Sequence, residues 1–147
     1  MAETLGMLCD QLTVVKLKQF HAENEEKLKS LQKQAQQLQE EIDRFISDAL
    51  SRKITIDRLT FASNKIYKKE GNEAPQARGT IAAVFEQLAD VNCRLWHEVE
   101  KGYDIENIPA NEKDKLIKTL ALLNLERNKC IDAIDQYFKE LVIKKIN

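Results

Sequence analysis

The stretch VVKLKQFHAENEEKLKSLQKQAQQLQEEIDRFISDA, residues 14–49, decides the fold class. Its apolar side chains recur in alternating steps of three and four residues, a spacing that places them on one side of an α-helix. Two later segments, 81–99 and 120–141, repeat this pattern. The patterns therefore predict an all-α protein, built as an antiparallel helical bundle with long first and last helices and a short second helix.

The helix boundaries follow from the residues that can begin or end a helix. No Pro or Gly interrupts the chain between Leu8 and Leu50, so one long first helix is expected, roughly 70 Å in length at 1.5 Å per residue. A flexible loop is expected at about 71–79, where the sequence holds two Gly and a Pro, inside a single domain over 1–147. The predicted helices run from Thr4 to Ser51, from Thr55 to about Lys69, from Thr80 to about Lys101, and from a cap at Asn111 to about Ile143.

Two arrangements of these helices are open. In the favoured one, the second and third helices run back along the first and the fourth returns beside them, which gives a three-legged bundle. In the other, the chain reverses after the second helix, and Asn92 meets Asn124 far from His21. The first arrangement gathers the polar residues of the stripes into one layer.

Those polar residues are the candidate site. Apolar stripes do not need polar side chains, yet the three stripes contain His21, Asn24, Asn92, Asn124 and Arg127. A buried amide or guanidinium costs several kcal/mol unless it is hydrogen-bonded. The polar side chains of such a layer therefore hydrogen-bond to one another, as polar residues that set the register of coiled coils do, or they bind a ligand.

Arg127 favours a ligand, because a buried cation needs a negative partner and its stripe supplies none. Either a small anionic ligand binds there, or a carboxylate reaches in from outside the stripe. The carboxylates considered for this role are Asp90, Glu98, Glu100 and Asp135.

Composition narrows the function classes. The 147 residues carry a net charge of −1, with 32% charged side chains in near balance, which argues against nucleic-acid binding. No run approaches the roughly 20 apolar residues of a membrane span, and the N-terminus lacks the pattern of a signal peptide, so a cytoplasmic protein without membrane contact is expected. The three cysteines show no paired spacing and are expected to be reduced.

No catalytic, cofactor or metal signature is found. His97-Glu98 begins a zinc-protease-like motif, but Lys101 stands where the second histidine is required. No Glu-x-x-His pair of a di-iron bundle is present, nor a Gly-rich phosphate loop. We therefore predict no cofactor, no metal and no catalytic residue.

Two resemblances add expectations. The segments Ile42-Asp43 to Arg52 and Ile131-Asp132-Ala133-Ile134-Asp135 resemble the opening of the helical chorismate mutases, which clamp a dicarboxylate with Arg and Lys side chains. Most of the chain resembles a bacterial helical family, the domain of unknown function number 4254, in Leu17-Lys18-x-x-His21, Asn92-x-x-Leu95-Trp96 and Asn124-x-x-Arg127-Asn128. This resemblance implies a helical domain in which the polar stripe residues matter.

The leading prediction is a cytoplasmic helical-bundle protein, non-enzymatic, that acts as an interaction or ligand-binding module. It would bind a protein partner or form a homo-oligomer through the leg 28–49. The alternative is a small-molecule enzyme or sensor with an anion-binding site in the bundle interior, as the resemblance to chorismate mutases implies.

Overall fold

The computed structural model describes residues 3–61, 74–77 and 79–146, and in this part of the chain it contains four α-helices, two 3₁₀ turns and no strands. The all-α prediction is therefore confirmed. The helices are α1 (Leu5–Phe20), α2 (Glu25–Leu50), α3 (Ile81–Gly102) and α4 (Ala110–Ile146), and the 3₁₀ turns are η1 (Ile56–Arg58) and η2 (Ile105–Asn107).

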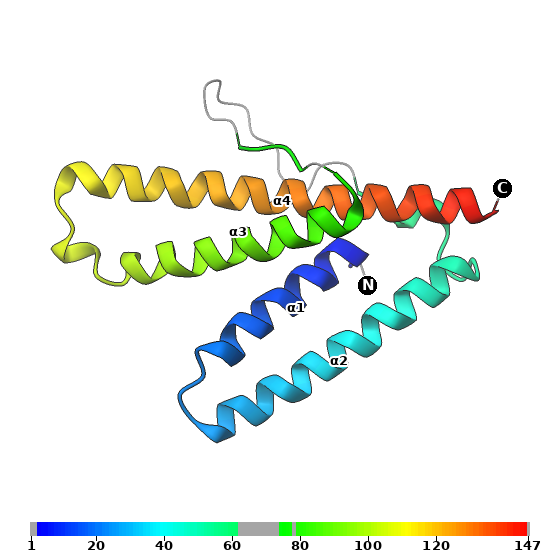
Figure 1. Cartoon of the computed structure of the whole chain (residues 1–147), viewed down its shortest axis with the longest axis horizontal. Coiled ribbons are helices and arrows are strands. Elements are labelled where there is room, and N and C mark those ends of the chain that lie inside the picture. The colour runs from blue at the N-terminus through cyan, green and yellow to red at the C-terminus, as the bar shows by residue number, and fades with distance from the viewer. Residues whose placement is uncertain (1–2, 62–73, 78, 147) are drawn as a thin grey trace.

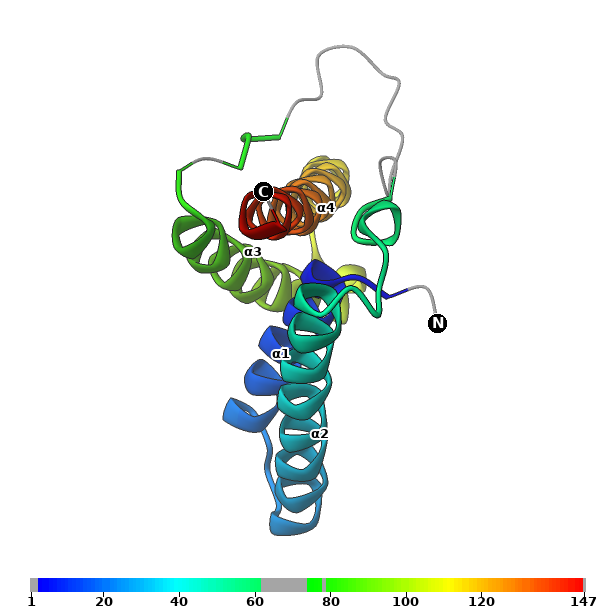
Figure 2. The same ribbon diagram turned by 90° about the vertical axis from the view of Figure 1, so that its right-hand side faces the viewer.

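The helices form two antiparallel hairpins, α1 with α2 and α3 with α4 (Figure 1). The start of α1 packs against α4, and the α1–α2 hairpin projects away from the α3–α4 hairpin (Figure 2). Neither predicted arrangement is correct, because both assumed an unbroken first helix. The helices nevertheless assemble into an antiparallel bundle, as predicted.

The predicted first helix is in fact two helices joined by a tight turn at residues 21–24. The His21 N–H donates to the Leu17 carbonyl at 3.1 Å, and Asn24 caps α2 by accepting from the Lys27 N–H at 2.8 Å. Asn side chains bond readily to nearby backbone and favour helix starts over helix interiors. The two polar residues that interrupt the first stripe therefore mark a turn.

The other boundaries agree in part with the predictions. Thr80 caps α3 by accepting from the Ala83 N–H at 3.2 Å, as expected. Asn111 is not the cap of α4, which already begins at Ala110 after Pro109. Of the predicted second helix only the η1 turn forms, residues 59–61 are non-helical, and 62–69 lie outside the described residues. Of the predicted loop, residues 74–77 are non-helical and 71–73 and 78 lie outside the described part.

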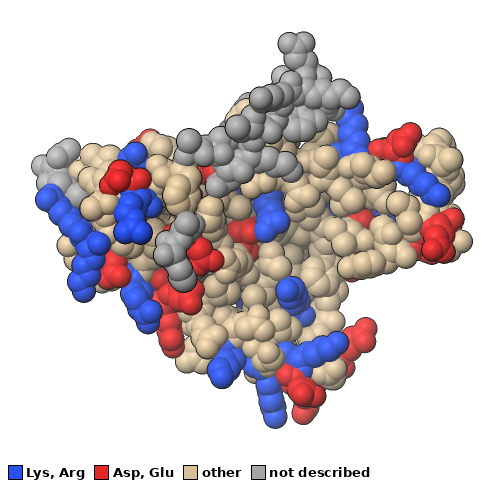
Figure 3. Space-filling view, turned by 180° about the vertical axis from the view of Figure 1, so that it is seen from behind, with Lys and Arg blue, Asp and Glu red and all other residues tan. Residues whose placement is uncertain are grey.

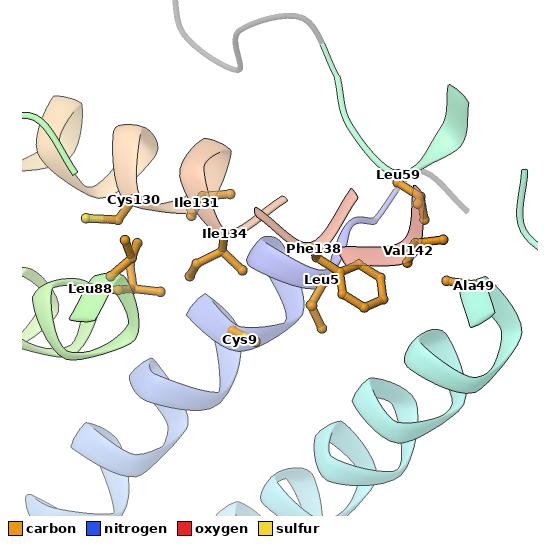
Figure 4. Packing of buried hydrophobic residues seen from close by; sticks show 11 residues of the cluster. Leu5, Cys9, Ala49, Leu59, Leu88, Cys130, Ile131, Ile134, Phe138 and Val142 are labelled. Atoms are coloured by element: carbon orange, nitrogen blue, oxygen red, sulfur yellow. The ribbon is translucent and has the colours of Figure 1, made fainter. Parts of the chain in front are cut away.

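The main core forms where α1 meets α3 and α4 (Figure 4). A second apolar cluster fills the α1–α2 hairpin, where Leu8 and Val15 pack on Ala35 and Leu38. The apolar stripe of α2 is thus covered by α1. The main core contains Leu5, Cys9, Ala49, Leu59, Val84, Leu88, Cys130, Ile131, Ile134, Phe138 and Val142.

The surface reflects the near-neutral composition. Positive and negative side chains are interspersed on the face opposite to that of Figure 1 (Figure 3). None of the described helices combines the length and the apolar character that crossing a membrane requires.

Candidate functional site

Asp10 of α1 lies at the centre of a buried polar cluster that joins three helices. Its side chain accepts from Arg127 of α4 through both carboxylate oxygens, with an Nε–Oδ1 distance of 2.8 Å. Asn92 of α3 donates to Asp10 Oδ1 at 2.9 Å and to Thr13 Oγ1 at 2.7 Å. The Thr13 hydroxyl donates to the Asp10 carbonyl at 2.7 Å. We call these four residues the Asp10 cluster.

The carboxylate that neutralises Arg127 was not among those expected. Asp10 is only 4% exposed, and its hydrogen bond raises the pKa of Arg127 against the opposing effect of burial. Asp90, Glu98, Glu100 and Asp135 do not pair with Arg127. The position of Asp10 could have been predicted from the sequence. It lies four residues before Val14, the first residue of the first stripe, and so continues the spacing of that stripe.

The five candidate residues do not form one layer. Asn92 and Arg127 meet at Asp10, as their positions in the stripes suggested. His21 and Asn24 lie in the turn between α1 and α2 instead. Asn124 is one turn before Arg127 on α4 and lines an adjacent pocket. The polar layer is therefore smaller than predicted, because the first helix breaks where two of its members lie.

His21 still reaches α3. Its ring stacks on Trp96 with centroids 4.6 Å apart and an interplanar angle of 19°, and its Nδ1 lies 2.8 Å from the Leu17 carbonyl oxygen. His97 is exposed, and its ring centroid lies 6.4 Å from that of His21. Since α1 ends at this stack and α3 continues to Gly102, the last turns of α3 extend past the end of α1.

A pocket of about 260 Å³ opens beside the Asp10 cluster, between α1, α3 and α4. Most of its lining is apolar, and its rim is formed by Val99, which is 41% exposed, and Tyr103, which is 86% exposed. We call it the Trp96 pocket. Its lining residues are Val14, Leu17, Asn92, Leu95, Trp96, Val99, Glu100, Tyr103, Asn124 and Arg127.

Two residues that line the Trp96 pocket carry a polar group without a partner among the described residues. Trp96 Nε1 is buried and has no hydrogen-bond partner, the one such side-chain atom in the described part of the chain. Glu100 takes part in none of the ion pairs formed among the described residues, and its neighbour Lys101 pairs with Glu98 at 2.9 Å. Buried donors normally find a partner, so the lone indole N–H of Trp96 is unusual, whereas the Glu100 side chain is exposed to water.

A second buried carboxylate, Asp135, holds the first turn of α1 to α4. Its Oδ1 accepts from the Gly6 N–H at 2.7 Å. Burial raises the pKa of Asp135 to about 6, against the lowering effect of hydrogen bonds from Thr4 and Gly6. Only a glycine fits at this contact, because a Cβ on Gly6 would lie 2.4 Å from the Ile131 carbonyl oxygen.

The three cysteines, Cys9, Cys93 and Cys130, form no disulfide among the described residues, and Cys9 and Cys130 are buried. Burial raises the pKa of Cys9 to about 12 and that of Cys130 to about 11. Both thiols therefore stay protonated near neutral pH and are poor nucleophiles. Within 3–61, 74–77 and 79–146, no three His, Cys, Asp or Glu side chains are grouped so that they could hold a metal ion.

Comparison with known proteins gives no match: no family model, no curated protein and no solved structure matches the chain. The resemblances to the helical chorismate mutases and to the bacterial family of unknown function remain predictions.

Proposed function

We propose that this protein is a non-enzymatic binding module that takes a small apolar group into the Trp96 pocket. The observation that carries this proposal is the unfinished packing of that pocket. Its walls are mainly apolar, Val99 and Tyr103 stand exposed at its rim, and Trp96 Nε1 has no partner. Concave apolar sites with a few polar groups are typical of ligand and partner binding.

Several of the groups that could act in catalysis are engaged in structural contacts or stay protonated. Arg127 is neutralised by Asp10, the Nδ1 of His21 is hydrogen-bonded to backbone, and the thiols of Cys9 and Cys130 stay protonated. General acid–base or nucleophilic chemistry needs such groups to be free to reach a substrate. This supports a binding role over the enzyme or sensor with an anion site.

The same contacts bear on the partners. An anion at Arg127 was expected because that cation lacked a carboxylate, and Asp10 now supplies one. The apolar stripe of α2 packs on α1, so it offers no support for self-association through the leg 28–49. A cytoplasmic location remains part of the proposal, on the grounds of composition.

The test uses the single tryptophan of the chain, whose indole N–H gives one resolved signal in a ¹⁵N correlation spectrum. The neutral probe 2-phenylethanol is titrated into the full chain. We expect a saturable shift of the Trp96 indole signal, because this residue lines the pocket.

Two variants decide whether the shift reports the pocket. Val99→Arg places a long charged side chain at the rim and should abolish the shift. Ile117→Arg changes an exposed apolar residue of α4, 58% exposed, that is not among the lining residues, and should leave the shift intact. The proposal fails if wild type shows no saturable shift, or if Val99→Arg responds like wild type.

A further inference from the structure

We propose that the ligand of the Trp96 pocket is an organic cation, an amine or guanidinium group on an apolar body. The inference rests on the proposed function and adds the sign of the ligand's charge. The positive group would lie against Glu100, Trp96 and Tyr103, and the apolar body would lie against the side chains deeper in the pocket.

The first step concerns charge. Two charged residues line the pocket, Arg127 and Glu100. Arg127 is already held by both oxygens of Asp10, so this pair contributes no net charge. Glu100 makes no ion pair with any residue that the structure describes. The uncompensated charge of the pocket is therefore negative, the opposite of what an unpaired Arg127 would give.

The second step concerns the rings beside that charge. Trp96, Glu100 and Tyr103 are spaced by four and three residues at the end of α3, so they follow one another along one side of the helix. All three line the pocket. The faces of Trp and Tyr rings attract cations, and a neighbouring carboxylate adds a direct charge interaction. His21 covers one face of the Trp96 ring and Tyr103 is 86% exposed, so the remaining ring faces beside an unpaired carboxylate are suited to an ammonium or guanidinium group.

The third step concerns size. The pocket holds about 260 Å³, slightly below the range of about 300–1,000 Å³ that drug-sized ligands occupy. Its mouth is open at Val99 and Tyr103, which are 41% and 86% exposed. It therefore suits one small amine, or a single Lys or Arg side chain presented by a partner protein.

The experiment compares three probes of similar shape and different charge: 2-phenylethylamine, 2-phenylethanol and 3-phenylpropionate. Each is titrated into the full chain while the Trp96 indole signal is followed. We expect the amine to bind roughly three- to thirtyfold tighter than the alcohol, the range of an exposed cation–π contact and an exposed ion pair together. The carboxylate should bind more weakly than the alcohol.

Variants assign the preference to Glu100. Glu100→Gln should remove the advantage of the amine over 2-phenylethanol. Glu86→Gln makes the same change of charge at an exposed position of α3 that is not among the lining residues, and should keep the preference. Equal affinities in wild type, tightest binding of the carboxylate, or a preference that persists in Glu100→Gln would each overturn the inference.

The proposed function can fail separately. If all three probes bind equally and Val99→Arg abolishes their binding, the proposed binding module is supported and the proposal of a cationic ligand is contradicted. If no probe shifts the indole signal, both proposals fail.

The source of the cation is tested with a Leu-rich helical peptide that carries one central Lys, and with its Lys→norleucine counterpart.

Binding by the Lys peptide that is lost in the norleucine form identifies a side chain of a partner protein. Binding of the free amine without the Lys peptide identifies a small molecule. Both results support a cationic ligand. Equal binding of the two peptides contradicts it.

Discussion

Asp10 of α1 and Asp135 of α4 are two of the three buried carboxylates of the described residues, beside Glu126, and they are held in different ways. Asp10 is 4% exposed and meets a guanidinium, while Asp135 is 2% exposed and meets the neutral Thr4 hydroxyl and Gly6 N–H. Burial raises the pKa of Asp135 to about 6 despite these donors. The comparison shows that neutral donors at the start of a helix do not fully offset the cost of desolvating a carboxylate. The contact of Asp135 with the start of α1 therefore depends on pH.

The two contacts also act on different parts of the fold. The Asp10 cluster ties α1 to both α3 and α4 and lies next to the Trp96 pocket. Asp135 ties only the first turn of α1 to α4. Loss of the first contact should therefore disturb the pocket, and loss of the second should mainly change stability.

The largest effect is expected from Arg127→Ala, which leaves the Asp10 carboxylate buried without its cation. Removing one partner of a buried pair costs about 3–5 kcal/mol, and we expect the lower end because the Arg127 side chain is 33% exposed. Urea unfolding followed by circular dichroism measures the loss. Lys118→Ala, an exposed cation of α4, is the control and should change little. A loss below about 1 kcal/mol would show that Asp10 does not depend on Arg127.

Asp135 should make stability depend on pH. An unfolded Asp titrates near 3.9, so between about pH 4 and 6 the unfolded chain ionises while the folded chain keeps its proton. The free energy of unfolding should therefore fall as pH rises through this window, by up to about 3 kcal/mol. The nearby Asp132 charge acts in the same direction.

The variant Asp135→Asn isolates this contribution. It cannot ionise, so the difference in unfolding free energy between wild type and variant should change between pH 4 and 6 and stay constant above. Denaturant titrations at a series of pH values measure it. A difference that is constant over the whole range would contradict the raised pKa of Asp135.

Gly6→Ala should destabilise the protein by about 1–3 kcal/mol, because the new methyl group would meet the Ile131 carbonyl at 2.4 Å and Asp135 Oδ1 at 2.9 Å. Gly102→Ala is a matched control, since a Cβ there has no neighbour within 4 Å. It should be neutral or slightly stabilising. Thermal unfolding of both variants makes the comparison, and equal melting temperatures would refute the close approach of α1 to α4.

The smallest effect is expected at the start of α2, where Asn24 is a neutral and exposed cap. Asn24→Ala should cost about 1 kcal/mol, without the pH dependence of the buried Asp135 contact. Asn111→Ala, at the position first predicted to cap α4, should cost less because Asn111 lies inside that helix. Urea unfolding at pH 5 and 7 tests both, and a larger loss for Asn111→Ala would reverse the assignment of the caps.

Periodicity predicted α3 and α4 well, because the steps of three and four residues continue along both helices and Thr80 offers a clear start. It failed at residues 21–24, since His21 and Asn24 fall in register with the stripe and a continuous helix was equally consistent with the spacing. For the site, it identified Asn92 and Arg127 but not Asp10. A list of polar residues on each stripe does not show which one from another helix will face them.

The sequence by itself determined that this protein is helical, that two long helices end the chain, and that Asn92 and Arg127 face the interior. These are consequences of local spacing, which needs no knowledge of neighbours. Only the tertiary structure decided that the first stripe folds back on itself and that Asp10 neutralises Arg127. It also decided that the end of α3 extends past α1 to leave the Trp96 pocket. Contacts between residues more than a hundred positions apart depend on how helices cross, and helix crossing is set by the packing of the whole molecule.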